Sequence, residues 1–176
     1  MLLMHLNYSP SGFSEELIIQ ARRLNKPLSI DDALKGENAV DKKIRVVCFI
    51  NQFFAQIGGE EKADIGFSVM EEPIGPAMLF QSAIEDVGEV VATVVCGDNY
   101  FSNLSPGEAA EEGFELVREL SPDLLFVGPS FNAGRYGLNC GELGSLAAKN
   151  LGIPVVGGMF EETPGAELYR KGIYII

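Results

Sequence analysis

Short apolar runs recur along the chain from residue 44 onward, separated by segments in which apolar positions follow a helical period. A continuous, β-branched run such as IRVVCFI is typical of a strand that is buried on both faces of a sheet. Strands that alternate with helices predict parallel pairing with right-handed crossovers and helices on both faces. We therefore expect an α/β three-layer sandwich with a mainly parallel sheet of about five strands, flavodoxin-like or Rossmann-like. The expected strands cover 44–50, 89–95, 123–128, 153–158 and 172–176.

Signals for helix boundaries lie between these runs. Pro76 suits the first turn of a helix and Gly88 its end, whereas Thr163 suits the cap of a later helix. In the first helix, the apolar residues at helical spacing are Met78, Leu79, Ala83 and Ile84. The expected helices cover 75–88, 105–120, 138–150 and 162–170.

Residues 1–43 carry no strand pattern of this kind. An amphipathic helix is expected from Ser14 to Leu24, and a shorter helical piece after Ser29. This helical or irregular leader either packs on the sheet or stays loose. The α/β domain spans 44–176, and because its last expected strand has no polar tail, we expect the chain to be a fragment of a longer subunit.

The charge balance and the cysteines limit the classes of partner and compartment. A formal net charge of -12 disfavours binding to nucleic acid or to an anionic membrane surface. Cys48, Cys96 and Cys140 are far apart and form no CxxC pair, so neither a disulfide framework nor a zinc site is indicated. The apolar start MLLMHL is too short for a membrane anchor, and we expect a cytoplasmic protein.

Three polar, glycine-bearing stretches each follow an expected strand directly. They are INQFFAQIGGEEKAD (50–64), CGDNYF (96–101) and FVGPSFNAGRYGLNCGE (126–142). Because the carboxyl ends of parallel strands meet at one edge of a sheet, we expect these stretches to form loops that share a ligand site. Neither a GxGxxG turn nor a GxxxxGK[ST] loop occurs, so no nucleotide motif is assigned.

Arg135 is the basic side chain in the third stretch, where it is expected to lie in a loop beside Tyr136. Its guanidinium could donate two parallel hydrogen bonds to a carboxylate ligand. A salt bridge to Glu60 or Glu61 that pins the loop is an equally good interpretation. Asn132 either orients a ligand or closes a turn.

Carboxylates gather in the other two stretches. Glu60, Glu61 and Asp64 could supply a general base or hold a metal, although solvated surface charge is the more common explanation for such a cluster. Asp98 and Asn99 are better placed for ligand contact, because they follow a strand end directly. Capping or turn formation is the competing role for this pair.

The sequence contains few residues that could act as an activated nucleophile. The only histidine, His5, lies in the leader, away from the expected sheet. Cys96 at a strand end and Cys140 in an expected helix turn are the candidate reactive thiols, but burial is the better interpretation for both, and Cys48 is expected in mid-strand. From the residues alone, this domain binds a substrate but lacks an evident catalyst.

Several long motifs from about residue 44 to 176 resemble one known family. INQFFAQIGGEEKADIG, GPAMLFQSAI, VVATVVCGDNYF, GPSFNAGRYG and GIPVVGGMFEETPG are similar, in this order, to the N-terminal region of the selenoprotein B subunit of glycine, sarcosine, betaine and D-proline reductases. The resemblance implies a role in the reductive deamination of a small amino acid. It also implies an oligomeric complex with a pyruvoyl-containing subunit and with the small selenoprotein A.

In this family the partner's pyruvoyl group holds the substrate amine, and a selenocysteine or cysteine of the B subunit attacks the α-carbon. That selenocysteine motif lies downstream of the matched region, so the resemblance places no cofactor in this chain and transfers the nucleophile to none of its cysteines. The catalytic residues stay unknown. The substrate-binding residues that the matched motifs imply are Gly58, Gly59, Glu60, Glu61, Cys96, Gly97, Asp98, Asn99, Asn132, Arg135 and Tyr136.

Overall fold

A six-stranded sheet forms the centre of the protein. The computed structural model describes residues 43–104 and 107–176. The strand order is β2-β3-β1-β4-β5-β6, and every neighbouring pair is parallel except β2 and β3. The strands are β1 (Ile44–Asn51), β2 (Ser68–Met70), β3 (Gly88–Cys96), β4 (Leu124–Phe131), β5 (Val155–Met159) and β6 (Tyr174–Ile175).

The order of the five parallel strands identifies the type of winding. Numbered by their appearance in the chain, these strands follow the order 2-1-3-4-5, which is that of flavodoxin-like sheets. The chain adds strands first on one side of β1 and then on the other. The carboxyl ends of β1 and β4 therefore border the switch point, where open α/β sheets bind ligands.

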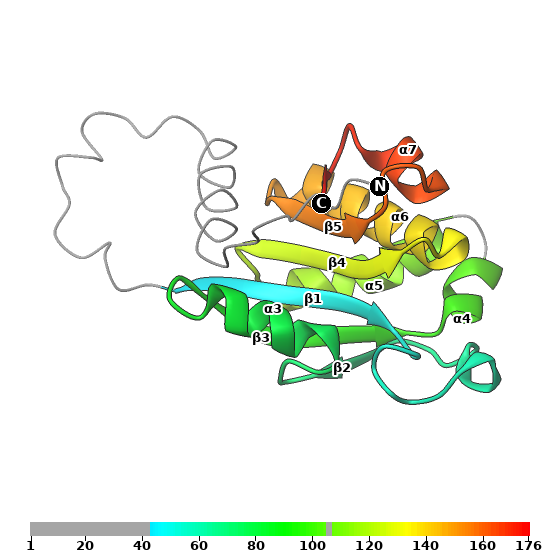
Figure 1. Cartoon of the computed structure of the whole chain (residues 1–176), viewed down its shortest axis with the longest axis horizontal. Helices are drawn as coiled ribbons and strands as arrows, with labels where there is room; N and C mark the ends of the chain where they lie inside the picture. The colour runs from blue at the N-terminus through cyan, green and yellow to red at the C-terminus, as the bar shows by residue number, and fades with distance from the viewer. Residues whose placement is uncertain (1–42, 105–106) are drawn as a thin grey trace, which may run out of the picture.

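Helices cover the two faces of the sheet unequally. Figure 1 shows α3 on one side, with α5 and α6 on the other. The larger core cluster joins the sheet to α5, α6 and α7, and the smaller one joins it to α3 alone. The helices are η1 (Glu60–Lys62), α3 (Pro76–Ile84), α4 (Asp98–Asn103), α5 (Glu108–Leu120), α6 (Gly134–Leu151) and α7 (Pro164–Tyr169).

Alternation along β1 distributes its side chains between the two cores. Val47 and Phe49 belong to the larger cluster, and Val46 and Cys48 to the smaller one. All residues from Val46 to Asn51 are buried, as the continuous apolar run predicts. The doubly covered parallel sheet expected from the sequence is thereby confirmed.

Three short elements were not predicted from the sequence: β2, α4 and η1, the last within the expected loop 50–64. β2 adds a sixth, antiparallel strand at the edge beside β3, within a stretch that we expected to be loop. α4 begins at Asp98, where we also expected a loop. Elements of three and six residues carry too few periodic positions to be recognised from sequence.

The loop predicted at 129–137, between the third strand and the third helix, is shorter than expected. β4 continues to Phe131 and α6 begins at Gly134, so only Asn132 and Ala133 connect the two elements. Glycines in α6 serve helix packing: a Cβ on Gly141 would come within 2.1 Å of the Tyr169 ring. The composition that suggested a loop therefore reflects close approach of α6 and α7.

The expected apolar face of α3 was right only in part. Ile84 is buried and Ala83 is half-buried, but Met78 and Leu79 are exposed, and Ala77 and Phe80 are buried in their place. The helix ends at Ile84, before Gly88, which instead opens β3. Two expectations held: Pro76 begins α3, and the Thr163 side chain caps α7. The helices predicted in 1–43 lie outside the described residues.

The contact of α7 with α6 gives a test of the fold. A Cβ on Gly165 would lie 2.3 Å from the backbone oxygen of Gly137, and backbone cannot move aside as a side chain can. We expect Gly165→Ala to lower the free energy of unfolding by about 1–3 kcal/mol. The control Gly134→Ala, with no atom within 4 Å of its Cβ, should stabilise by about 0.5–1 kcal/mol. Urea unfolding measures both changes, and equal stabilities of the two variants would contradict the packing described.

Candidate functional site

A cleft of about 580 Å³ lies at the switch point, between the carboxyl ends of β1 and β4. Stretches that follow three different strands meet there, as the sequence predicted. Of the predicted site residues, the cleft is lined by Gly59, Glu60, Asp98, Asn132 and Tyr136. Sequence reasoning missed Asn51, Gln52, Phe53, Phe54, Ser130 and Phe131, which also line it.

Asp98 is held against the end of β1 by two amide side chains. Asn51 Nδ2 donates to a carboxylate oxygen of Asp98 over 2.9 Å, and the backbone N–H of Asp98 donates to Gln52 Oε1 over 3.0 Å. Desolvation by partial burial raises the pKa of Asp98, against smaller opposing effects of Asn51 and Arg135. The cleft therefore contains a carboxylate whose ionised form is short of solvation.

Arg135 lies in the first turn of α6 rather than in a loop. It donates to both carboxylate oxygens of Glu60, over 2.9 and 3.3 Å, and to Asn99 Oδ1 over 2.5 Å. Of the two interpretations of Arg135, a carboxylate-binding group or a salt bridge, the structure therefore contains the salt bridge, to Glu60. Because both partners are exposed, the pair contributes only about 0–1 kcal/mol to stability.

Tyr136 forms the buried end of the cleft. Its ring packs against Phe49 and Phe54, and its hydroxyl donates to the backbone oxygen of Phe49 over 3.4 Å. Complete burial raises the pKa of this phenol. The structure thus gives Tyr136 a core role beside the cleft.

The remaining predicted residues support the loops around the cleft. Cys96 and Gly97 are buried, and the N–H of Gly97 donates to Ile65 O over 2.9 Å. Glu61 is exposed, and hydrogen bonds from its own N–H and that of Gly59 lower its pKa. Gly58 precedes this turn, so Gly58 and Glu61 shape the loop without lining the cleft.

Three phenylalanines form an aromatic wall along the cleft. The rings of Phe53 and Phe54 have centroids 5.5 Å apart, and those of Phe54 and Phe131 are 6.0 Å apart. Phe53 and Phe131 are 63% and 52% exposed, which is unusual for side chains of this kind. The sequence signal for this wall was the pair Phe53-Phe54, directly after a buried strand.

The cleft contains no reactive thiol. All three cysteines are free and buried, and burial raises the pKa of Cys96 to about 12 and that of Cys48 and Cys140 strongly. Within residues 43–104 and 107–176, no group of three or more His, Cys, Asp or Glu side chains could hold a metal ion. The described residues supply binding groups rather than a nucleophile.

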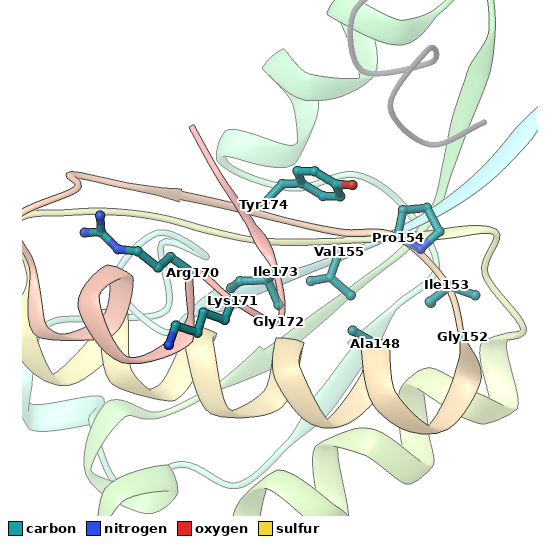
Figure 2. Close-up of a pocket in the computed structure, with 10 residues that line it drawn as sticks. All are labelled: Ala148, Gly152, Ile153, Pro154, Val155, Arg170, Lys171, Gly172, Ile173 and Tyr174. Carbon is teal, nitrogen blue, oxygen red and sulfur yellow. The ribbon is translucent and has the colours of Figure 1, made fainter. Parts of the chain in front are cut away.

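A smaller hollow of about 350 Å³ lies between the end of α6 and β6. Figure 2 shows the side chains of Arg170 and Lys171 extending away from its apolar wall of Ile153, Pro154 and Val155. Arg170 already donates to the backbone oxygens of two nearby residues. Because its charged groups do not converge, this hollow is a poor ligand site.

None of the helices in the described part of the chain combines the length and the apolar character that a bilayer span needs.

Comparison with known proteins identifies relatives of the whole α/β domain. The family described as glycine/sarcosine/betaine reductase selenoprotein B matches residues 43–176. The glycine reductase complex component B subunit gamma of Carboxydothermus hydrogenoformans is 49% identical over 134 residues, which are 76% of this chain and 31% of the relative. No solved structure matches.

Two relatives from Peptoclostridium acidaminophilum carry other substrate names. A sarcosine reductase complex component B subunit beta is 47% identical over 77% of this chain and 31% of its own length. A betaine reductase complex component B subunit beta is 34% identical over 75% of this chain and 30% of its own length. The chain thus spans about a third of the length of the curated relatives it matches.

Cysteine burial predicts low thiol reactivity. In the native protein, we expect all three cysteines to react with a disulfide reagent on the order of a hundredfold more slowly than a free thiol, because burial suppresses the thiolate. All three should react rapidly in denaturant, which serves as the control. One fast-reacting equivalent in the native protein would reveal an activated thiol and contradict this description.

The raised pKa of Asp98 predicts a pH-dependent gain in stability for Asp98→Asn. The pKa of this carboxyl is higher in the folded protein than in the unfolded chain. Its ionisation therefore lowers the free energy of unfolding once the pH rises above the pKa of the unfolded chain, about 3.9. We expect the variant to have the higher Tm at neutral pH, with the difference vanishing in acid. Thermal melts across this range, with the exposed Asp86→Asn as control, measure it. A lower Tm at neutral pH would show that the ionised carboxylate stabilises the fold.

Proposed function

Because the chain belongs to the glycine/sarcosine/betaine reductase selenoprotein B family, we propose that it is part of the substrate-specific component of an amino-acid reductase. The reaction would be the reductive deamination of glycine, sarcosine, betaine or D-proline. The switch-point cleft would recognise the positively charged nitrogen of that substrate, whether free or held by the partner's pyruvoyl group. The observation that carries this proposal is a half-buried carboxylate, Asp98, in one cleft with an aromatic wall at the position where α/β sheets bind ligands.

The charges of the cleft favour a cation over an anion. Its charged lining residues in the described structure are Glu60 and Asp98, both acidic. The nearby cation, Arg135, is already paired with Glu60. A carboxylate ligand would have to displace Glu60 from Arg135, whereas an ammonium group meets Asp98 directly.

The aromatic wall supports an alkylated amine in particular. A quaternary or alkylated ammonium group is attracted to the faces of aromatic rings, by about 0.5–2 kcal/mol according to its desolvation. Phe53 and Phe131 are exposed and line the same cleft as Asp98. Each candidate substrate has a positively charged nitrogen next to a carboxylate-bearing carbon, which fits this lining.

The other parts of the reaction are assigned to partners. We propose that a pyruvoyl-containing subunit and a small selenoprotein act with this chain in the cytoplasm, as the family resemblance implies. The described cysteines are buried, so the nucleophile would come from outside the described residues.

A second function, subunit assembly, is favoured by one specific observation. Apolar side chains are exposed beside the last strand: Phe160 is 55% and Ile176 is 50% exposed. Clustered exposed apolar residues mark interaction surfaces. Assembly and amine binding are compatible, since the two surfaces adjoin.

A titration followed by NMR tests amine binding. We expect millimolar sarcosine or betaine to shift the amide signals of Asn51, Asp98 and Asn132, and Asp98→Asn to weaken this binding at least tenfold. Asp86→Asn, which removes a carboxylate far from the cleft, should bind normally.

Acetate and glycine serve as further ligands in the same titration. Acetate has the carboxylate without the amine, and we expect no shifts at the cleft because the cleft is acidic. Shifts with acetate equal to those with glycine would mean that the carboxylate end is recognised. No shifts with any amine would reject direct binding by this domain.

A further inference from the structure

Exposed apolar side chains gather at the carboxyl ends of β4, β5 and β6. On the α3 side of the sheet, Leu124, Phe126 and Val156 are buried within the smaller core cluster, to which α3 is the only helix that the described residues contribute. In Figure 1, α3 lies along β1 and β3. Phe131, Phe160 and Ile176, at or just beyond the strand ends, are exposed, so this end of the sheet carries an open apolar area in the described part of the chain.

A groove of about 650 Å³ occupies this area. Its walls are mainly apolar, and Phe131, Phe160 and Ile176 are each at least half exposed. Glu161 and Glu162 add two carboxylates to its lining. The groove therefore fits a segment with an apolar face and basic side chains at its margin.

The groove is continuous with the amine cleft. Phe131 lines both of them. Its ring is 6.0 Å from that of Phe54 in the cleft and 6.4 Å from that of Phe160 in the groove. A polypeptide seated in the groove would thus reach the open side of the cleft.

We propose that this groove seats polypeptide from the two thirds of the reductase subunit that this chain does not span, and that this polypeptide completes the amine cleft. The relatives are about three times as long as the matched region, so such polypeptide exists in the family. The described residues offer no reactive thiol, so the cleft needs a further chemical group. The completion of the cleft rests on the proposed function, whereas the occupancy of the groove does not.

A second copy of this chain fits the groove less well. With a net charge of -12 and two glutamates in the groove, two copies would bring like charges together. The groove also continues the apolar face of the sheet, and such a face is ordinarily covered by polypeptide of the same domain.

Hydrogen exchange on complete proteins tests the proposal. The full-length Carboxydothermus hydrogenoformans subunit is compared with this chain at the segments aligned with 158–162 and 173–176. We expect exchange there to be at least tenfold slower in the full-length subunit. The segment aligned with α5, on the opposite face, should exchange equally in both. Equal exchange in the groove segments would overturn the proposal.

Variants of this chain distinguish the other occupants. We expect a monomer by light scattering, and hydrophobic-dye fluorescence that falls at least twofold in Phe160→Asp combined with Ile176→Asp. Leu168→Asp, at an equally exposed position on α7, is the control that should leave the fluorescence unchanged. A dimer that the groove variants dissociate would assign the groove to a second copy. Dye binding that increases only after removal of residues 1–42 would assign it to that segment. Either result overturns the proposal.

Because the amine titration and the groove measurements have separate readouts, one can fail without the other. Loss of amine binding with a protected groove would retain the interface and reject the proposed ligand. Equal exchange in the groove segments together with intact amine binding would reject the interface and retain the proposed ligand.

Discussion

The pairing of β1 with both β3 and β4 is the constraint on which the rest of the structure depends. Because β1 is central, it must be apolar on both faces, and its side chains organise both cores. Its position also fixes where the chain first becomes polar. Asn51, the last residue of the strand, is consequently buried at the switch point, where it hydrogen-bonds the Asp98 carboxylate. The same strand therefore orders the core and positions the most perturbed carboxylate of the cleft.

The cleft combines rigid support with exposed recognition groups. Asp98 is held by side chains from β1, while Glu60 and Arg135 form an exposed pair at the rim, which contributes little to stability. Phe53 and Phe131 remain exposed although both side chains are large and apolar. Retaining an underhydrated carboxylate and exposed rings has a cost in stability, and such costs are common at functional sites.

The open apolar end of the sheet adjoins the cleft. The groove over this end and relatives about three times as long as the matched region are consistent with the proposed docking of further polypeptide. Phe131 belongs to both the groove and the cleft, so the proposed assembly surface and the proposed ligand site share a boundary. Burial of all three cysteines fits the proposal that the nucleophile comes from another part of the complex.

The sequence by itself determined the five parallel strands, the intervening long helices and the edge at which polar stretches meet, because these depend on local periodicity and on the general rules of α/β winding. The motifs also indicated the family. Only the tertiary structure decided which partner Arg135 takes, because Glu60 lies 75 residues away. It also decided that Tyr136 is a core residue and that Phe131 lines the cleft, since burial depends on what packs from other elements. β2 and α4 are stabilised by long-range contacts rather than by their own few residues, so no local pattern could reveal them.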